Sequence, residues 1–183
     1  MLRRNPRTSW NSKESMPSVA STAYVDESAV VIGDVRIGES VYVGPCASIR
    51  ADEATPIVIG DECNVQDGAI FHGLKGSSIK LGRKVSVAHG AVIHGPLTIG
   101  DESFIGFNSV VHASTVGERC FIGHRALVMG VTLKDGSFVP HGSVIDTQDK
   151  ADALGPVPDS LKGFNAEVVE VNCEFASGYR AAR

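Results

Sequence analysis

The chain has 183 residues and a formal net charge of −4. That length suits one domain with a substantial core, and the negative charge without any basic run argues against nucleic acid or an anionic membrane surface as a partner. No stretch approaches the roughly 18 consecutive apolar residues of a membrane span, and the first arginines are not followed by the apolar stretch of a secretory signal, so we expect a cytoplasmic protein.

Residues 1–18 form an N-terminal segment, after which aliphatic residues recur every six positions. Glycine often follows them, as in "IGESVY", "IGDECN" and "IGDESF". The leading positions are Val19, Val25, Val31, Ile37, Val43, Ile49, Ile59, Val65, Phe71, Leu81, Val87, Ile93, Ile99, Ile105, Val111, Val116, Ile122, Val128, Leu133, Val139 and Ile145.

This hexapeptide pattern resembles that of the left-handed parallel β-helix family. In such a fold each six-residue unit builds one side of a triangular prism, three units make one coil, and each coil buries its apolar face only by stacking on its neighbours. We therefore predict an all-β solenoid, a left-handed parallel β-helix of about seven coils over residues 19–146. A β-sandwich of short strands would instead show a period of two with hairpin turns.

Two four-residue additions, near residues 55–58 and 77–80, interrupt the register. Both fall at the same corner of successive coils. We expect them to form adjacent outward bulges, which is where function tends to lie on a solenoid.

The period ends after Ile145, and residues 147–183 form a separate C-terminal segment. "DTQDKADALG" predicts a short helix, and "GPVPD" is typical of a linker. From Asn165 onwards, Val168, Phe175 and Tyr179 recur with helical spacing, which predicts a C-terminal α-helix packed along the prism. Asn172 shares this apolar stripe, where a side-chain amide needs a partner.

The register places Arg50, His72 and His94 in one column, each one residue after a leading aliphatic in successive coils. Neighbouring strands are about 4.8 Å apart, so His72 and His94 can converge on one ion. His89 stands ahead of the corner and should point away from this column within its own chain.

We hypothesise that His72 and His94 of one protomer and His89 of another complete a three-histidine site in a cyclic trimer. A fourth position left for water distinguishes catalytic from structural zinc. The alternative is three exposed histidines on a regular surface. His112, which continues the column, and His124 and His141, which share the offset of His89, are interpreted as surface residues. The four cysteines lack CxxC spacing, so thiolate zinc is not expected.

Three segments together resemble the γ-class carbonic anhydrases. They are "ASIRADE" (47–53), "NVQDGAIFH" (64–72) and "VSVAHGAVIHGP" (85–96). The resemblance implies a homotrimer with interfacial metal sites, in which metal-bound hydroxide reversibly hydrates CO2 to bicarbonate. It implies Zn²⁺ as the metal, with Fe²⁺ or Co²⁺ as alternatives that imidazole ligands also suit.

The same resemblance assigns roles to individual residues. Gln66 corresponds to the residue that orients the metal-bound water, Asn172 to a partner for CO2 or bicarbonate, and Glu53 to an active-site carboxylate that accepts a proton. Arg50 is expected to pair with Asp67 across the interface. Asn64 is expected to anchor the site by hydrogen bonding.

The stretch "HGLKGSSIKLG" departs from the longer acidic loop of archaeal members, with Lys75 where their proton-shuttling glutamate would lie. A protonated lysine cannot accept a proton, so we expect proton export to be slow or buffer-dependent, or to use Glu53. Two other functions stay open. One is a catalytically weak or silent trimeric scaffold or assembly subunit, and the other is a CoA-dependent acyltransferase that uses one histidine as a base.

Overall fold

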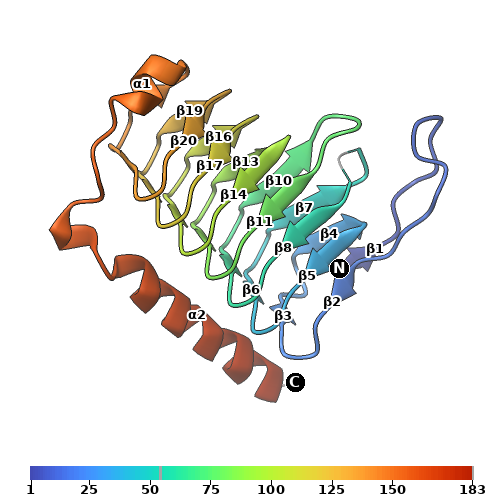
Figure 1. Ribbon diagram of the computed structural model, residues 1–183. Coiled ribbons are helices and arrows are strands. Elements are labelled where there is room, and N and C mark those ends of the chain that lie inside the picture. Colours follow the sequence, from blue (N-terminus) through green and yellow to red (C-terminus); the bar gives the residue numbers. More distant parts are fainter. Residues whose placement is uncertain (54, 183) are drawn as a thin grey trace.

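The computed structural model describes residues 1–53 and 55–182. The chain winds into a parallel β-helix whose short strands stack rung upon rung into three sheets, and a long helix runs along the outside (Figure 1). We name the sheets the histidine sheet, the helix sheet and the third sheet.

The histidine sheet contains β1 (Leu2–Arg3), β4 (Val30–Gly33), β7 (Ser48–Ala51), β10 (Ile70–Gly73), β13 (Val92–Gly95), β16 (Val110–His112), β19 (Leu127–Met129) and β22 (Val144–Ile145). The helix sheet contains β3 (Tyr24–Val25), β6 (Tyr42–Val43), β9 (Asn64–Val65), β12 (Ser86–Val87), β15 (Phe104–Ile105), β18 (Phe121–Ile122) and β21 (Phe138–Val139). The third sheet contains β2 (Ser18–Val19), β5 (Val35–Ile37), β8 (Ile57–Ile59), β11 (Ile79–Leu81), β14 (Leu97–Ile99), β17 (Thr115–Val116) and β20 (Thr132–Leu133). The remaining elements are α1 (Gln148–Asp152), the 3₁₀ helix η1 (Asp159–Leu161) and α2 (Phe164–Ala181).

The six-residue register is confirmed, because the leading aliphatics pair with one another between successive coils. Ile49, Phe71 and Ile93 are in register across β7, β10 and β13, and all three are fully buried. Every predicted leading position from Val31 to Ile145 belongs to the buried core. Because side chains alternate between the two faces of a strand, the residue after each leading aliphatic points outward.

The two predicted bulges lie next to each other. They occupy the loops that precede β8 and β11. Both strands begin inside the ranges predicted for the additions, 55–58 and 77–80. The backbone N–H of Thr55 donates to the carbonyl oxygen of Ser77, 2.9 Å away, and joins the two loops. Both project from the same edge of the prism, on the side of the N-terminal loop (Figure 1).

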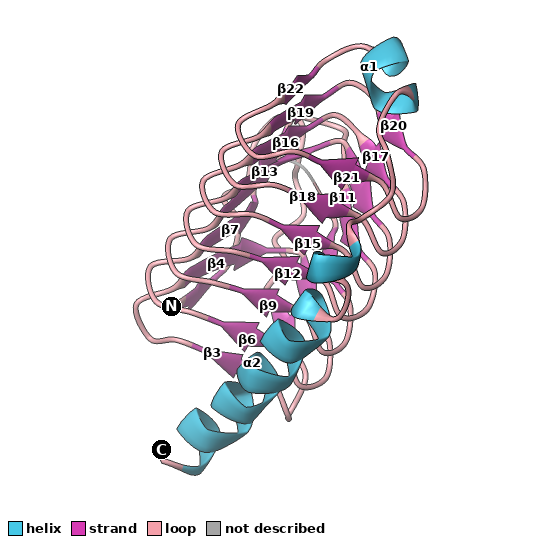
Figure 2. Cartoon of the chain, turned by 90° about the vertical axis from the view of Figure 1, so that its left-hand side faces the viewer, coloured by secondary structure: helices cyan, strands magenta, loops and turns pink. Residues whose placement is uncertain are grey.

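Helix α2 lies across the helix sheet, where it contacts β3, β6, β9 and β12 (Figure 2). Val169, Asn172 and Ala176 are its buried residues, whereas Phe175 and Tyr179 of the predicted stripe stay about half exposed. The ring of Tyr179 nevertheless stacks on Tyr24, with centroids 5.0 Å apart. The predicted helix therefore packs along the prism, but through a face centred on Asn172.

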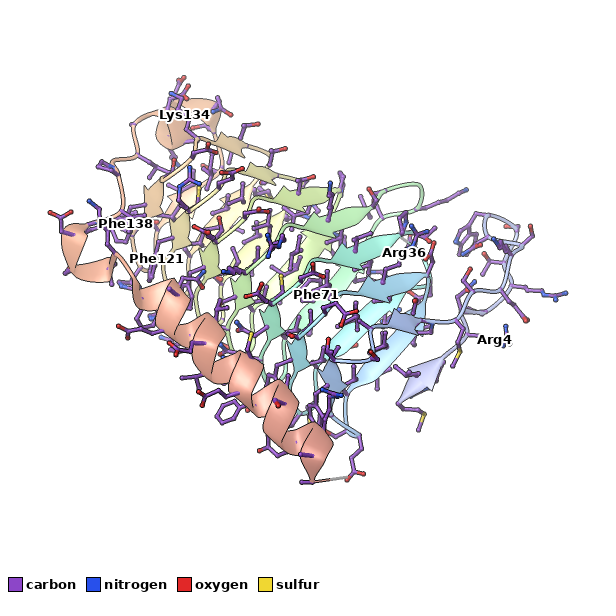
Figure 3. All side chains as sticks on the ribbon, turned by 60° about the horizontal axis from the view of Figure 1, so that its bottom comes forward. Arg4, Arg36, Phe71, Phe121, Lys134 and Phe138 are labelled. Atoms are coloured by element: carbon purple, nitrogen blue, oxygen red, sulfur yellow. The ribbon has the colours of Figure 1, made fainter. Side chains whose placement is uncertain are left out.

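Both ends of the solenoid carry additional structure. Within the N-terminal segment, Leu2–Arg3 forms the first strand of the histidine sheet, and the side chain of Asn5 ties together the loop that follows. At the other end, the Gln148 side chain of α1 exchanges hydrogen bonds with the backbone of Thr132. Near the start of α2, Phe121 and Phe138 lie side by side, 5.9 Å between centroids (Figure 3). Among the described residues no helix has the length and apolar character to cross a bilayer.

Candidate active site

The first half of the candidate site is a column of imidazoles on the histidine sheet. His72, His94 and His112 are paired in register on β10, β13 and β16. Ring centroids are 5.6 Å apart for His72 and His94 and 4.9 Å apart for His94 and His112. The three rings are partly buried, which leaves each of them accessible from outside the prism. The strand register thus brings together the predicted ligands His72 and His94.

Two carboxylates lie close to the Nε2 atom of His72. Its Nε2 lies 3.4 Å from Oδ1 of Asp52 and 3.9 Å from Oε2 of Glu53. The Asp52 Oδ1 is buried and accepts no hydrogen bond among the described residues. The other oxygen of Asp52, Oδ2, accepts from Arg50 at 3.0 Å. A buried carboxylate oxygen without a donor favours a cation at this end of His72.

Glu53 is held by the backbone of the second bulge. Its Oε1 accepts from the N–H of Lys75, 3.0 Å away. The Lys75 side chain points elsewhere, with its Nζ 5.8 Å from the centre of the Trp10 ring. The lysine expected in place of a shuttle residue therefore contributes a backbone donor to Glu53, while its ammonium group rests on the N-terminal segment.

The second half of the site begins at the corner between the helix sheet and the histidine sheet, where His89 occupies the turn between β12 and β13. The next residue, Gly90, has φ +69°, a left-handed conformation that glycine adopts without strain, and a Cβ there would lie 2.4 Å from the side-chain Oδ1 of Asn108. The His89 side chain is 55% exposed, and its Nδ1 lies 3.7 Å from Oδ2 of Asp67 on the preceding coil. The turn thus presents His89 outward from the prism.

Polar residues behind His89 form a short hydrogen-bonded chain. Gln66 donates from Nε2 to Oδ1 of Asn64 at 2.9 Å, and Asn64 donates to Oγ of Ser86 at 2.8 Å. Asn64 and Ser86 are fully buried and Gln66 is nearly so. Because its amide nitrogen is engaged, Gln66 has a fixed orientation. Asn64 therefore hydrogen-bonds Gln66, another of the predicted site residues.

A cavity of about 430 Å³ connects these residues with α2. Its polar members include Gln66, Asp67, His89 and Asn172, and most of its wall is apolar. Asn172 donates from Nδ2 to the carbonyl oxygen of Val168, 2.8 Å away, which uses one of its donors. The lining residues are Tyr42, Gln66, Asp67, His89, Phe104, Phe107, Phe164, Glu167, Val168, Val171, Asn172 and Phe175.

The predicted site residues therefore fall into two groups on one chain. Arg50, Glu53, His72 and His94 lie on or beside the histidine sheet, whereas Asn64, Gln66, Asp67, His89 and Asn172 lie on the helix sheet, its corner and α2. Within residues 1–53 and 55–182 of a single chain, no three His, Cys, Asp or Glu side chains are grouped to hold a metal ion.

Comparison with known proteins identifies the family. The chain is 40% identical to the carbonic anhydrase of Methanosarcina thermophila, over 98% of this chain and 81% of that protein. This chain belongs to the γ-class carbonic anhydrase family. A hexapeptide-repeat model, described as the hexapeptide repeat of succinyl-transferase, matches residues 96–116 and 114–147.

Two further relatives mark the range of proteins that share this domain. The carboxysome assembly protein CcmM of a Nostoc species is 38% identical over 97% of this chain, which spans 34% of that longer protein. The crystal structure of a hexapeptide transferase family protein from Anaplasma phagocytophilum superimposes with a TM-score of 0.77 over 90% of this chain and 93% of that chain. At 24% identity, this likeness concerns the fold alone.

Carbonic anhydrases of this family imply a metal cofactor, and the hydrogen bonds show which imidazoles fit one. The Nδ1 of His94 faces the carbonyl oxygen of Gly95 at 3.2 Å. A carbonyl only accepts, so this Nδ1 carries the proton and leaves the Nε2 lone pair free for a metal, the usual arrangement of a metal-binding histidine. For His89, Oδ2 of Asp67 lies 3.7 Å from Nδ1, which is a nearby negative charge rather than a hydrogen bond.

His124 and His141 have the opposite arrangement. The Nδ1 of His124 accepts from the N–H of Phe107, and the Nδ1 of His141 accepts from the N–H of His124. The ring proton of each neutral imidazole therefore stands on Nε2, which removes that lone pair. The two rings continue a stack that starts at His89 and passes through Phe107. They fit the surface role interpreted from the sequence.

Sequence reasoning missed two neighbours of the site. Asp52 immediately precedes Glu53, and Tyr42 lines the cavity one coil before Gln66. Burial, assisted by the negative charge of Asp67, raises the pKa of Tyr42 to about 12. A larger cavity, about 970 Å³, lies along α2 but is lined by none of the predicted site residues.

Proposed function

We propose that this γ-class carbonic anhydrase homologue is a homotrimer that hydrates CO2 at metal sites shared between protomers. The observation that carries the proposal is the division of the site into two incomplete halves on different faces of one prism. His72 and His94 face outward from the histidine sheet, and His89 faces outward from the corner of the helix sheet. A cyclic arrangement joins one face of each copy to the other face of the next, and so completes every site.

The donor set suits zinc. Two imidazoles from one protomer and one from its neighbour supply three nitrogen ligands and leave a fourth position open, which is the arrangement of catalytic zinc. Fe²⁺ and Co²⁺ are the alternatives that the same ligands accept. When bound, such an ion lowers the pKa of coordinated water to about 7, a figure long established for carbonic anhydrases and not obtained from this chain.

The cavity beside His89 provides the binding surface for substrate. CO2 is apolar, and the aromatic and aliphatic wall that includes Phe107 and Val168 can accept it. Gln66, with its nitrogen held by Asn64, turns a fixed carbonyl oxygen to the site and orients the attacking water. Asn172 offers its amide to CO2 or bicarbonate from α2.

Glu53 is the proton acceptor in this scheme. Its carboxylate is 37% exposed and close to His72, so it can take a proton from the site and release it to buffer. Arg50 pairs with Asp52 within the chain, and we propose that in the trimer its remaining donors reach Asp67 of the neighbouring protomer. This pair would align protomers rather than react.

A trimeric scaffold is the second candidate function. It is favoured by the 38% identity to a carboxysome assembly protein over nearly the whole of this chain. Such a protein would keep the interfacial metal for structural reasons and hydrate CO2 weakly or not at all. The acyltransferase alternative is supported by the fold and by the match to the hexapeptide-repeat model.

One sample decides between these functions. Reduced protein, purified without added metal, is analysed for metal content and mass, and its CO2 hydration is followed by stopped flow at several buffer concentrations. We expect a trimer with one zinc per protomer and hydration above the buffer background. A metal-loaded trimer without hydration would favour the scaffold, and a metal-free protein that acetylates an acceptor from acetyl-CoA would favour the transferase.

A further inference from the structure

A third histidine of the column makes a contact that the proposed reaction does not use. The Nδ1 of His112 lies 3.1 Å from the Nδ1 of His94, and the two residues are paired in register on β16 and β13. Two unprotonated nitrogens at that distance would oppose their lone pairs, so one of the two carries a proton and donates it to the other.

The direction of this hydrogen bond follows from the surroundings of His94. Its Nδ1 also faces the carbonyl oxygen of Gly95, which can only accept. The proton therefore stands on His94, and His112 accepts it through an unprotonated Nδ1. With its Nδ1–H engaged by two acceptors, His94 keeps its Nε2 lone pair pointing away from His112.

We propose that His112 is a positioning residue for the metal ligand His94. The inference rests on the proposed function, in which His94 binds the metal through Nε2. Outer hydrogen-bond partners of metal-binding histidines fix the tautomer and the ring orientation, and their loss typically weakens metal affinity 10- to 100-fold. His112 adds a second acceptor for the His94 Nδ1–H beside the carbonyl oxygen of Gly95.

The position of His112 permits clean substitutions. It is the last residue of β16, it points out of the prism, and it is only partly buried. Phenylalanine keeps the ring and removes the acceptor. Asparagine places an acceptor oxygen near the former Nδ1, whereas glutamine places its polar atoms near the former Nε2, so the Asn and Gln variants form a matched pair. His141→Phe serves as a control for loss of an exposed histidine.

The test is zinc affinity by competition with a chelator, measured on trimeric protein for the wild type and the four variants at one pH. We expect about 10- to 100-fold weaker binding for His112→Phe and His112→Gln, near-wild-type binding for His112→Asn, and no change for His141→Phe. Nitrogen-15 NMR of the imidazoles in metal-free protein should show His94 protonated on Nδ1 in the wild type, and a larger share of the Nε2-protonated tautomer in His112→Phe, where the carbonyl oxygen of Gly95 remains as an acceptor but His112 does not.

The outcomes separate this inference from the proposed function. Wild-type affinity in both His112→Phe and His112→Gln, with the His94 tautomer unchanged, would overturn the positioning role and leave the proposed function standing. A wild-type protein that binds no zinc would overturn the proposed function and the positioning role together. If His112→Phe does not fold, the comparison of asparagine with glutamine decides.

Discussion

Gln66 donates its side-chain amide to Asn64, 2.9 Å away, and lines the cavity that contains His89. Asn64 is fully buried and also donates to Ser86. Asn64, buried on the interior strand β9 of the helix sheet, thus holds the side-chain nitrogen of Gln66 at the cavity wall.

We expect Asn64→Ala to lower both stability and the rate of CO2 hydration. The substitution leaves Gln66 and Ser86 without a buried partner, which costs about 1–3 kcal/mol of unfolding free energy, and it frees the amide of Gln66 to rotate. Ser86→Ala is the matched control, because it leaves the bond between Gln66 and Asn64 intact. Urea unfolding and stopped-flow hydration measure the two effects, and equal losses of activity in both variants would argue against an orienting role for Asn64.

Glu53→Gln should slow hydration most strongly at low buffer concentration. An amide cannot accept the proton, so turnover then depends on buffer molecules that reach the site. A roughly 10²-fold loss, largely restored by concentrated imidazole buffer, is the expected result. Lys75→Ala should leave the rate nearly unchanged, because Lys75 holds Glu53 through its backbone N–H. A buffer-independent loss in Glu53→Gln would contradict proton transfer through this carboxylate.

Removal of the metal should destabilise the trimer itself. In the proposed trimer the ligands come from two protomers, so bound metal would link them and stabilise the folded assembly by mass action, by about 2.7 kcal/mol when free metal is 100 times its Kd. Thermal unfolding with and without chelator, at constant protein concentration, should show a lower Tm for the metal-free protein. An unchanged Tm and an unchanged dissociation profile would place the metal away from the interface.

His124→Phe should flatten the acid side of the stability profile. Burial, followed by the charge of His141, lowers the pKa of His124 below its ordinary 6.5, so the unfolded chain takes up this proton more readily than the folded one. The stability that this group contributes is complete above pH 6.5 and is lost as the pH falls through the folded-state pKa.

Urea unfolding of metal-free wild type and His124→Phe, above and below pH 6.5, measures this difference. The wild type should lose more unfolding free energy than the variant on acidification. Parallel pH profiles would show that His124 titrates alike in the folded and unfolded chains.

The fold was predictable because one repeated constraint determines it. Each leading aliphatic must face the core, so the six-residue spacing alone determines the coil, the sheet and the rung of residues such as His72 and His94. The outward direction of these two side chains then follows from strand alternation. The position of His89 in a corner turn follows from the same count.

The details of the site depend on loops and side-chain rotamers, which the repeat does not constrain. Lys75 was predicted from its position to replace a shuttle residue, but its side chain packs on Trp10, a residue of the N-terminal segment far away in sequence. Asp52 lies in a bulge outside the register, and its contact with His72 depends on the path of that loop. The tautomers of His94 and His124 depend on the individual hydrogen-bond partners of each Nδ1, which the sequence spacing does not reveal.

Subunit mixing tests the central claim most directly. His89→Ala and His94→Ala protomers should each form trimers that bind no metal and do not hydrate CO2. After random mixing in equal amounts, each mixed trimer contains one boundary at which an intact His89 meets an intact His72 and His94, so about a quarter of the wild-type metal and activity should return. Mixed trimers, verified by mass, that recover neither metal nor turnover would contradict a site shared between protomers.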